Sequence, residues 1–167
     1  MTVDGVTDVG DWYVSEGGHD RAGRDQFEGA AGTLLGRKTF EGLAAFWPQQ
    51  TGAWAEVLPR PKFVASRTLQ IPLEWNATLI EGDTAEGVSR LKDGLDSDLP
   101  LIGCGELARH LLANGLTDEL RFWLHPTVCG EGTRRYLGET VRMRLLDSTS
   151  YDSGVTLLRY EPLGKVR

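Results

Sequence analysis

The stretch Thr33-Leu34-Leu35-Gly36-Arg37-Lys38-Thr39 decides the fold class, because an apolar run, a glycine and two cations follow one another in it. The run is short and apolar throughout, as expected of a strand that is covered on both faces. The glycine allows a sharp turn, and we predict a helix from about Thr39 onward. A strand followed at once by a helix is the unit from which parallel α/β sheets are built.

The same alternation extends on both sides of this stretch. It predicts short strands at residues 62–65, 77–80 and 99–102, and helices at 20–31, 84–92 (with Thr84 as N-cap) and 106–113. After Leu120 the pattern changes to three strands without helices between them, at 120–128, 142–150 and 155–160. We therefore expect one α/β domain over residues 1–167, with a mainly parallel sheet and antiparallel C-terminal strands.

The composition argues against several classes of protein. A chain of 167 residues, 40% hydrophobic and 25% charged, is typical of one globular domain. It has no apolar run of membrane-spanning length and no secretory signal pattern, so we expect a cytoplasmic protein without membrane partners. The net charge of -6 argues against nucleic-acid binding. Two cysteines make no disulfide framework, and the histidines share no metal-ligand spacing with them, so we expect no metal.

Three turns follow predicted strands and could hold phosphate. They contain Gly36, Arg37 and Thr39; Ser66, Arg67 and Thr68; and Gly103, Cys104, Gly105, Glu106 and Leu107. Glycine lets the backbone approach a ligand, a helix N-terminus attracts anions, and arginine can add a two-pronged contact. Each turn alone also fits a plain loop, with Thr39 as a helix cap and Cys104 as a small residue that fits. Together, at the carboxyl ends of three strands, they predict a site for a phosphorylated small ligand.

The ordered motifs also carry a family resemblance. They are Val3-Asp4-Gly5-Val6, Leu35-Gly36-Arg37-Lys38-Thr39-Phe40, Ser66-Arg67-Thr68, Gly103-Cys104-Gly105-Glu106-Leu107 and His125-Pro126-Thr127-Val128-Cys129-Gly130-Glu131-Gly132. In this order they resemble the reductase domain at the C-terminus of the bifunctional riboflavin-biosynthesis deaminase-reductase, and the stand-alone bacterial proteins of the dihydrofolate reductase family. The resemblance covers nearly the whole chain.

This resemblance implies a three-layer α/β/α fold that binds NADPH and passes hydride to a pteridine or pyrimidine. By position, the turn at Gly36 would hold the adenosine side and pyrophosphate, and the turn at Ser66 the adenosine 2′-phosphate. The turn at Gly103 would lie beside the pyrophosphate and nicotinamide ribose. Arg37 and Arg67 would favour NADPH over NADH. A homodimer is also expected.

The chain departs from the family pattern in two places. Only Met1-Thr2-Val3 precede Asp4, so the family's first strand is missing or reduced, and the true start is expected to lie upstream. The zinc deaminase signature is absent, so this chain is not expected to catalyse the deaminase step in addition to the reductase step of the riboflavin pathway.

Two carboxylates and one aromatic residue are the candidates for the substrate side. Asp4 matches the family's aspartate near the substrate, and Asp20 lies near the start of the first predicted helix, where an ordinary N-cap is the alternative. Trp12 is kept as a ring that could stack on a flat heterocycle, whereas Trp47, Trp54, Trp75 and Trp123 are assigned to the core or its rim. Two other readings stay open: a non-catalytic nucleotide-binding or ligand-sensing module, and a structural domain that dimerises through its sheet edge.

Overall fold

The computed structural model describes residues 1–13, 17–49, 51, 59–134 and 140–165, so Trp54 lies outside the described residues. The chain forms two compact units. The middle unit is Gly23–His110, and the terminal unit joins Met1–Ala22 to Leu111–Arg167. Helices α1 (Gly18–Glu28) and α5 (Glu106–Ala113) carry the chain from one unit to the other. That the two units behave as one domain stays a prediction.

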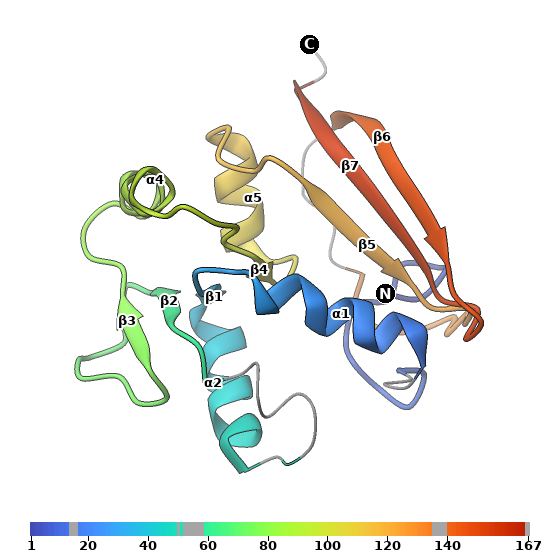
Figure 1. Ribbon diagram of the computed structural model, residues 1–167, viewed down its shortest axis with the longest axis horizontal. Helices are drawn as coiled ribbons and strands as arrows, with labels where there is room; N and C mark the ends of the chain where they lie inside the picture. Colours follow the sequence, from blue (N-terminus) through green and yellow to red (C-terminus); the bar gives the residue numbers. More distant parts are fainter. Residues whose placement is uncertain (14–16, 50, 52–58, 135–139, 166–167) are drawn as a thin grey trace. The chain divides into compact units, whose positions relative to one another are not determined.

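The middle unit contains a four-stranded parallel sheet in the order β3-β2-β1-β4 (Figure 1). Its strands are β1 (Thr33–Gly36), β2 (Lys62–Ala65), β3 (Ala77–Leu79) and β4 (Leu101–Ile102). Helix α2 (Arg37–Phe46) follows β1 directly and leads into the 3-10 helix η1 (Trp47–Gln49), while α4 (Thr84–Gly94) precedes β4. Parallel neighbours need a crossover connection. Helices α2 and η1 lie between β1 and β2, and α4 lies between β3 and β4, whereas residues 66–76 join β2 to β3 without a helix.

The core of the middle unit joins β1 and β2 to α2. Leu35 and Val64 are fully buried, and Phe40, one turn into α2, is buried against them. Partly buried residues, among them Trp75 and Ile102, pack around this cluster. Because Phe40 and Leu35 share one core, the end of β1 and the first turn of α2 are held in a fixed relation.

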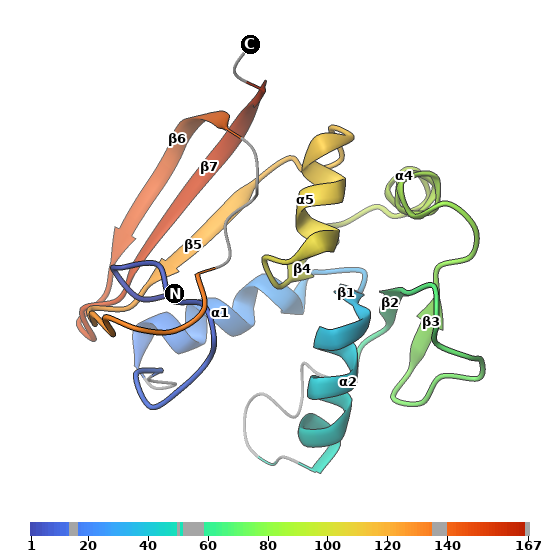
Figure 2. The same cartoon turned by 180° about the vertical axis from the view of Figure 1, so that it is seen from behind.

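The terminal unit contains an antiparallel sheet of β5 (Leu120–Leu124), β6 (Val141–Ser150) and β7 (Thr156–Lys165), in the order β5-β7-β6 (Figure 2). The parallel sheet with its helices and this antiparallel sheet confirm the predicted fold class. The first strand is indeed reduced: Thr2 makes only an isolated parallel bridge to His125. The amide of Val3 extends that contact by donating to the carbonyl of Thr127 at 2.9 Å.

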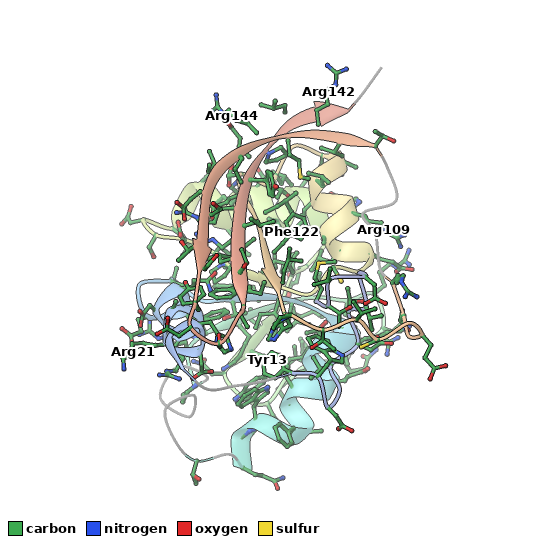
Figure 3. All side chains as sticks on the ribbon, turned by 90° about the vertical axis from the view of Figure 1, so that its right-hand side faces the viewer. Tyr13, Arg21, Arg109, Phe122, Arg142 and Arg144 are labelled. Atoms are coloured by element: carbon green, nitrogen blue, oxygen red, sulfur yellow. The ribbon has the colours of Figure 1, made fainter. Side chains whose placement is uncertain are left out.

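Strand β6 is the most exposed element of the terminal unit. Among the described residues it pairs with β7 alone, and Leu145 and Leu146 are 52% and 46% exposed. Arg142 and Arg144 extend outward from the same strand (Figure 3). An unpaired edge that carries apolar side chains is an unusual surface for a protein that stays monomeric.

Several local predictions differ from the structure. Helix α1 covers Gly18–Glu28 and not 20–31, α2 begins at Arg37 and not at Thr39, and β4 covers only Leu101–Ile102 of the expected 99–102. Asp83, not Thr84, caps α4, because its Oδ1 accepts from the amides of Ala85 and Glu86 at 2.9 and 3.0 Å. Strand β5 ends at Leu124, just before the segment of Pro126, which has no N–H for a ladder. Strand β7 runs to Lys165 because β6 offers it a partner over ten residues. Among the described residues, no helix combines the length and apolarity that crossing a membrane would need.

Candidate functional site

The three turns predicted from the sequence begin at one edge of the parallel sheet. The register pairs Gly36 of β1 with Ala65 of β2, and Leu35 of β1 with Ile102 of β4. The residues that follow these strands therefore leave the sheet side by side. Neighbouring strands lie about 4.8 Å apart, so all three turns are within reach of one small ligand.

The turn after β1 leaves the first amides of α2 without a side-chain acceptor. Gly36 is the N-cap residue and has no side chain to make a capping bond. Thr39 lies inside the helix, so the alternative in which it caps α2 is wrong. Unpaired N–H groups and the helix dipole give this end a partial positive charge, which suits a phosphate.

The two arginines of the predicted site differ in what they contact. Arg37 donates through Nη1 to both carboxylate oxygens of Glu41, at 3.1 and 2.9 Å, one helical turn away. Arg67 is exposed and makes no hydrogen bond or ion pair within the described part of the chain. Its loop is shaped by Ser66, whose Oγ accepts from the amides of Thr68 and Leu69 at 3.1 and 3.0 Å. Of the two guanidinium groups, that of Arg67 is thus the one without an anionic partner among the described residues.

The turn after β4 lies close against the first turn of α2. Gly103 has a φ of +115°, and a Cβ at this position would lie 3.3 Å from Oγ1 of Thr39. Leu107 in α5 packs near Gly36, since a Cβ on that glycine would lie 3.7 Å from the Cβ of Leu107. Cys104 is a half-buried free thiol. Gly105 has open space around it, and Glu106 is exposed. The structure thus brings together the residues predicted to hold a cofactor, and their binding role stays a prediction.

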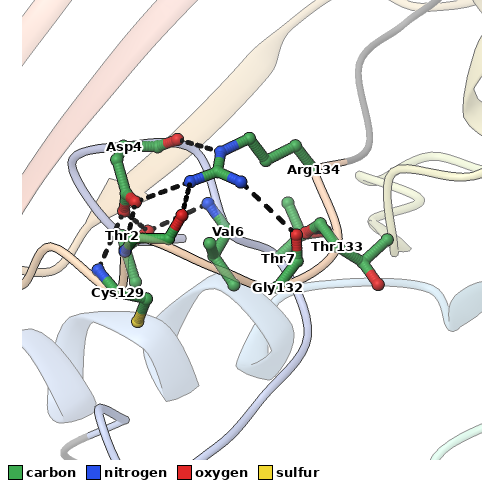
Figure 4. A network of polar contacts seen from close by, with 9 residues as sticks. Thr2, Asp4, Val6, Thr7, Cys129, Gly132, Thr133 and Arg134 are labelled. Carbon is green, nitrogen blue, oxygen red and sulfur yellow. Dashed lines mark hydrogen bonds and ion pairs between the residues drawn. The ribbon is translucent and has the colours of Figure 1, made fainter.

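Asp4 in the terminal unit is surrounded by donors (Figure 4). Its carboxylate accepts from the Thr2 hydroxyl at 2.6 Å, the amides of Cys129 and Gly130 at 3.2 and 2.9 Å, and Nη2 of Arg134 at 2.8 Å. The Thr2 hydroxyl first, and then the backbone and Arg134 donors, hold the pKa of Asp4 well below its usual range, although burial opposes them. Asp4 therefore stays ionised at neutral pH, when it can polarise a substrate but has no proton to donate.

Asp20 and Trp12 both belong to the terminal unit, and each interacts with Tyr13. Asp20 falls within the first turn of α1, which begins at Gly18, so it is not an N-cap. Burial, and then the charge of Asp20, raise the pKa of Tyr13. The indole of Trp12 donates to the carbonyl of Asp8 at 3.0 Å.

Four rings of the terminal unit, which we name the His125 cluster, comprise His125, His19, Trp12 and Tyr13. Both imidazoles are buried, and the rings of Trp12 and Tyr13 each lie 5.1 Å from that of His125, centroid to centroid. The ring of His19 lies 5.8 Å away, and its Nδ1 is 2.8 Å from the hydroxyl of Ser153. The Nδ1 atom of His125 is buried and has no hydrogen-bond partner among the described residues.

Comparison with known proteins identifies the family to which this chain belongs. The family described as the RibD C-terminal domain matches residues 1–157. The chain belongs to the RibD C-terminal domain family. This is the family of reductase domains that the ordered motifs resembled.

The individual proteins that resemble this RibD C-terminal domain share less than a third of its residues over the aligned regions. The uncharacterized protein YyaP of Bacillus subtilis (strain 168) is 29% identical over 135 residues, which are 76% of this chain and 71% of that protein. RibD of Acinetobacter baumannii has a TM-score of 0.67 at 17% identity, over 96% of this chain and 55% of its own. A pyrimidine reductase-like protein from Corynebacterium diphtheriae has a TM-score of 0.61 at 13% identity, over 98% of this chain and 89% of its own. The last two share the fold with this chain.

Sequence reasoning did not find the His125 cluster of this RibD C-terminal domain. The histidines were tested for metal-ligand spacing, and the described residues contain no group of three or more side chains able to hold a metal. A usable signal was present, because His125 belongs to one of the motifs that carry the family resemblance.

We expect His125 to make this domain sensitive to acid. Burial first, and then the positive charges of the Met1 amine and His19, lower the pKa of His125 from 6.5 to about 4. Between these two values the unfolded chain binds a proton more readily than the folded one. The stability present above pH 6.5 is therefore lost as the pH falls through 4. The melting temperature measured from pH 7 to pH 4 should fall less in His125→Phe, which keeps a ring and cannot be protonated, than in the wild type.

The matched control is His110→Phe, at an exposed position on α5. It should keep the acid sensitivity of the wild type. Equal pH profiles for His125→Phe and the wild type would show that other groups cause the acid loss.

Proposed function

We propose that this chain is an NADPH-dependent reductase that acts on a planar heterocycle of the pteridine or pyrimidine type. The family assignment supports a reductase. The observation that carries the cofactor proposal is the convergence of three turns at one sheet edge, with the N-terminus of α2 open among them.

The residues at this edge fit the chemistry of a dinucleotide phosphate. Gly36 and Gly103 have no side chain to block the approach of the backbone to a pyrophosphate. The first amides of α2 would donate to one phosphate, and Arg67 would meet the 2′-phosphate with its unpaired guanidinium. When bound, NADPH would supply the hydride.

The chain's own groups would orient and polarise the substrate. Asp4 would act as a fixed negative charge, since its donors keep it ionised. Asp20 would be the carboxylate that holds or moves a proton, with the Tyr13 hydroxyl within its electrostatic influence. Trp12 would stack on the heterocycle.

Two measurements test the proposal in sequence. Calorimetric titration with NADPH should give saturable binding, and absence of binding would contradict the proposal. Loss of NADPH absorbance should then be followed with pteridines, pyrimidines and quinones as acceptors. Binding without turnover of any acceptor would favour the non-catalytic nucleotide-binding module instead.

We further propose a cytoplasmic homodimer that uses the β6 edge. Leu145 and Leu146 on this strand are exposed, and a second copy would cover them and pair the free edge. Light scattering should then give about twice the monomer mass of 18.4 kDa. Glutamate at both leucines should shift the protein to the monomer, because two charges would enter the interface.

Ile71→Glu is the control for the dimer. It places a charge at an exposed apolar position outside β6 and should leave the mass of the wild type unchanged. A wild-type mass of 18.4 kDa at all concentrations would refute the dimer.

A further inference from the structure

Among the described residues of the terminal unit, one side-chain nitrogen is buried without a hydrogen-bond partner. The side chain of His125 is 3% exposed, and its Nδ1 makes no hydrogen bond within the described part of the chain. Leaving a polar group buried and unpaired costs stability, whereas a phenylalanine could fill a ring-shaped space without that cost. The imidazole therefore calls for an explanation beyond packing.

The His125 ring is covered by the rings of Trp12 and Tyr13, the second of which a ring of another molecule could replace. Trp12 and Tyr13 lie against the imidazole, and their own hydrogen bonds stay within their segment: Trp12 donates to Asp8, and the amide of Tyr13 donates to Gly10. Turning the Tyr13 side chain away from His125 leaves its bond to Gly10 intact, because that bond is made by the backbone amide. A flat ring of another molecule could take the same place and supply the missing partner.

We propose that His125 hydrogen-bonds the heterocyclic substrate through Nδ1, with the substrate ring replacing Tyr13 against the imidazole. This inference rests on the proposed function, because it names the residue that recognises the pteridine or pyrimidine. Such rings carry N–H and C=O groups in their plane and a π face above it, so one ring can satisfy the nitrogen and restore the ring contact.

Among the polar groups in this part of the terminal unit, His125 is better suited than Asp4 to bind the substrate ring. The bridge to Thr2 places His125 beside the turn that carries Asp4, so both lie in the same part of the terminal unit. The Asp4 carboxylate already accepts from four donors, whereas His125 Nδ1 has capacity left. Burial lowers the pKa of His125 to about 4, so the imidazole is neutral at pH 7 and suits an uncharged ring.

The test uses three replacements of His125 and two ring probes. Phenylalanine keeps the ring without a polar atom, asparagine places an amide near the position of Nδ1, and glutamine places it near Nε2. Pterin and 5-aminouracil represent the two ring classes, and their binding to the NADP⁺-saturated protein is measured by calorimetry. We expect His125→Phe and His125→Gln to weaken ring binding at least ten-fold, His125→Asn to retain most of it, and His110→Phe to leave it unchanged.

A second measurement keeps the test independent of whether the variants fold. In the wild type, the imidazole nitrogen resonances of His125 are followed by NMR as the ring probe is added, and the Nδ1 signal should shift in a saturable way. Ring binding that is equal in His125→Phe and the wild type, or an unmoved Nδ1 signal at saturation, would overturn the proposal. So would a wild type that binds NADPH but neither ring, a result that leaves the cofactor part of the proposed function intact.

Discussion

Replacement of Arg67 by alanine will weaken NADPH binding about ten- to a hundred-fold and leave NADH binding unchanged. The 2′-phosphate is the only group that distinguishes the two cofactors, and it carries roughly two negative charges near neutral pH. Arg67 follows β2 and has no partner among the described residues, so its guanidinium can meet that phosphate without giving up another contact. Titration of the wild type and variant with both cofactors measures the effect.

Arg37→Ala is the matched comparison for Arg67→Ala. Arg37 already binds both oxygens of Glu41, an exposed pair that is worth only about 0.3–0.5 kcal/mol, so a phosphate must first displace a weak contact. We therefore expect a smaller loss from Arg37→Ala. Lysine at position 67 should also bind NADPH less well than arginine, since it cannot form two parallel bonds. Equal binding of NADPH and NADH by the wild type would defeat the explanation.

Replacement of Gly103 by alanine will abolish most cofactor binding and lower stability by about 1–3 kcal/mol. The φ of +115° lies well beyond the left-handed helical region that an ordinary side chain can adopt. The new Cβ would also lie 3.3 Å from Oγ1 of Thr39, so relief of the strain must move the turn away from α2. That movement would separate two of the three turns that converge on the proposed pyrophosphate site. Thermal melts and NADPH titration report the two effects separately.

Gly115→Ala serves as the control for backbone strain alone. Gly115 also has a positive φ, +69°, but nothing lies within 4 Å of the position of its Cβ. This variant should lose some stability and keep NADPH binding. A Gly103→Ala protein that binds NADPH like the wild type would mean that the turn after β4 does not contact the cofactor.

The sequence was sufficient to predict the strands and helices that are determined by their own residues and immediate neighbours. The apolar run at Leu34 and Leu35, followed by Gly36, contains its own strand and turn, and residues 62–65 and 106–113 form the expected strand and helix. The N-cap of α4 was misplaced by one residue because Asp83 and Thr84 are both good caps. The extent of β7 depends on β6, a partner that local patterns do not report.

The candidate site also has a part that local sequence predicts and a part that depends on the folded chain. The convergence of the three turns could be predicted because each follows a strand, and the strands of a parallel sheet all end at one edge. The His125 cluster could not, because His19 and His125 are over a hundred positions apart and meet only in the folded chain. The sequence analysis named Arg37 as a candidate phosphate ligand but did not predict that its guanidinium pairs with Glu41, one helical turn later.

The exposed strand β6 also bears on how the protein avoids aggregation. Within the described residues, this ten-residue strand pairs with β7 alone, so its other edge, with its exposed leucines, is a template onto which an extended chain could add. Arg142 and Arg144 precede those leucines, and Asp147 follows them, all on the exposed strand. Such charges oppose indiscriminate pairing, because an added strand would have to take Arg142 and the Arg144–Glu161 ion pair out of water. A matched partner can supply an acidic group for Arg142. Neutralising these three residues would leave the fold intact and make the protein prone to form fibrils.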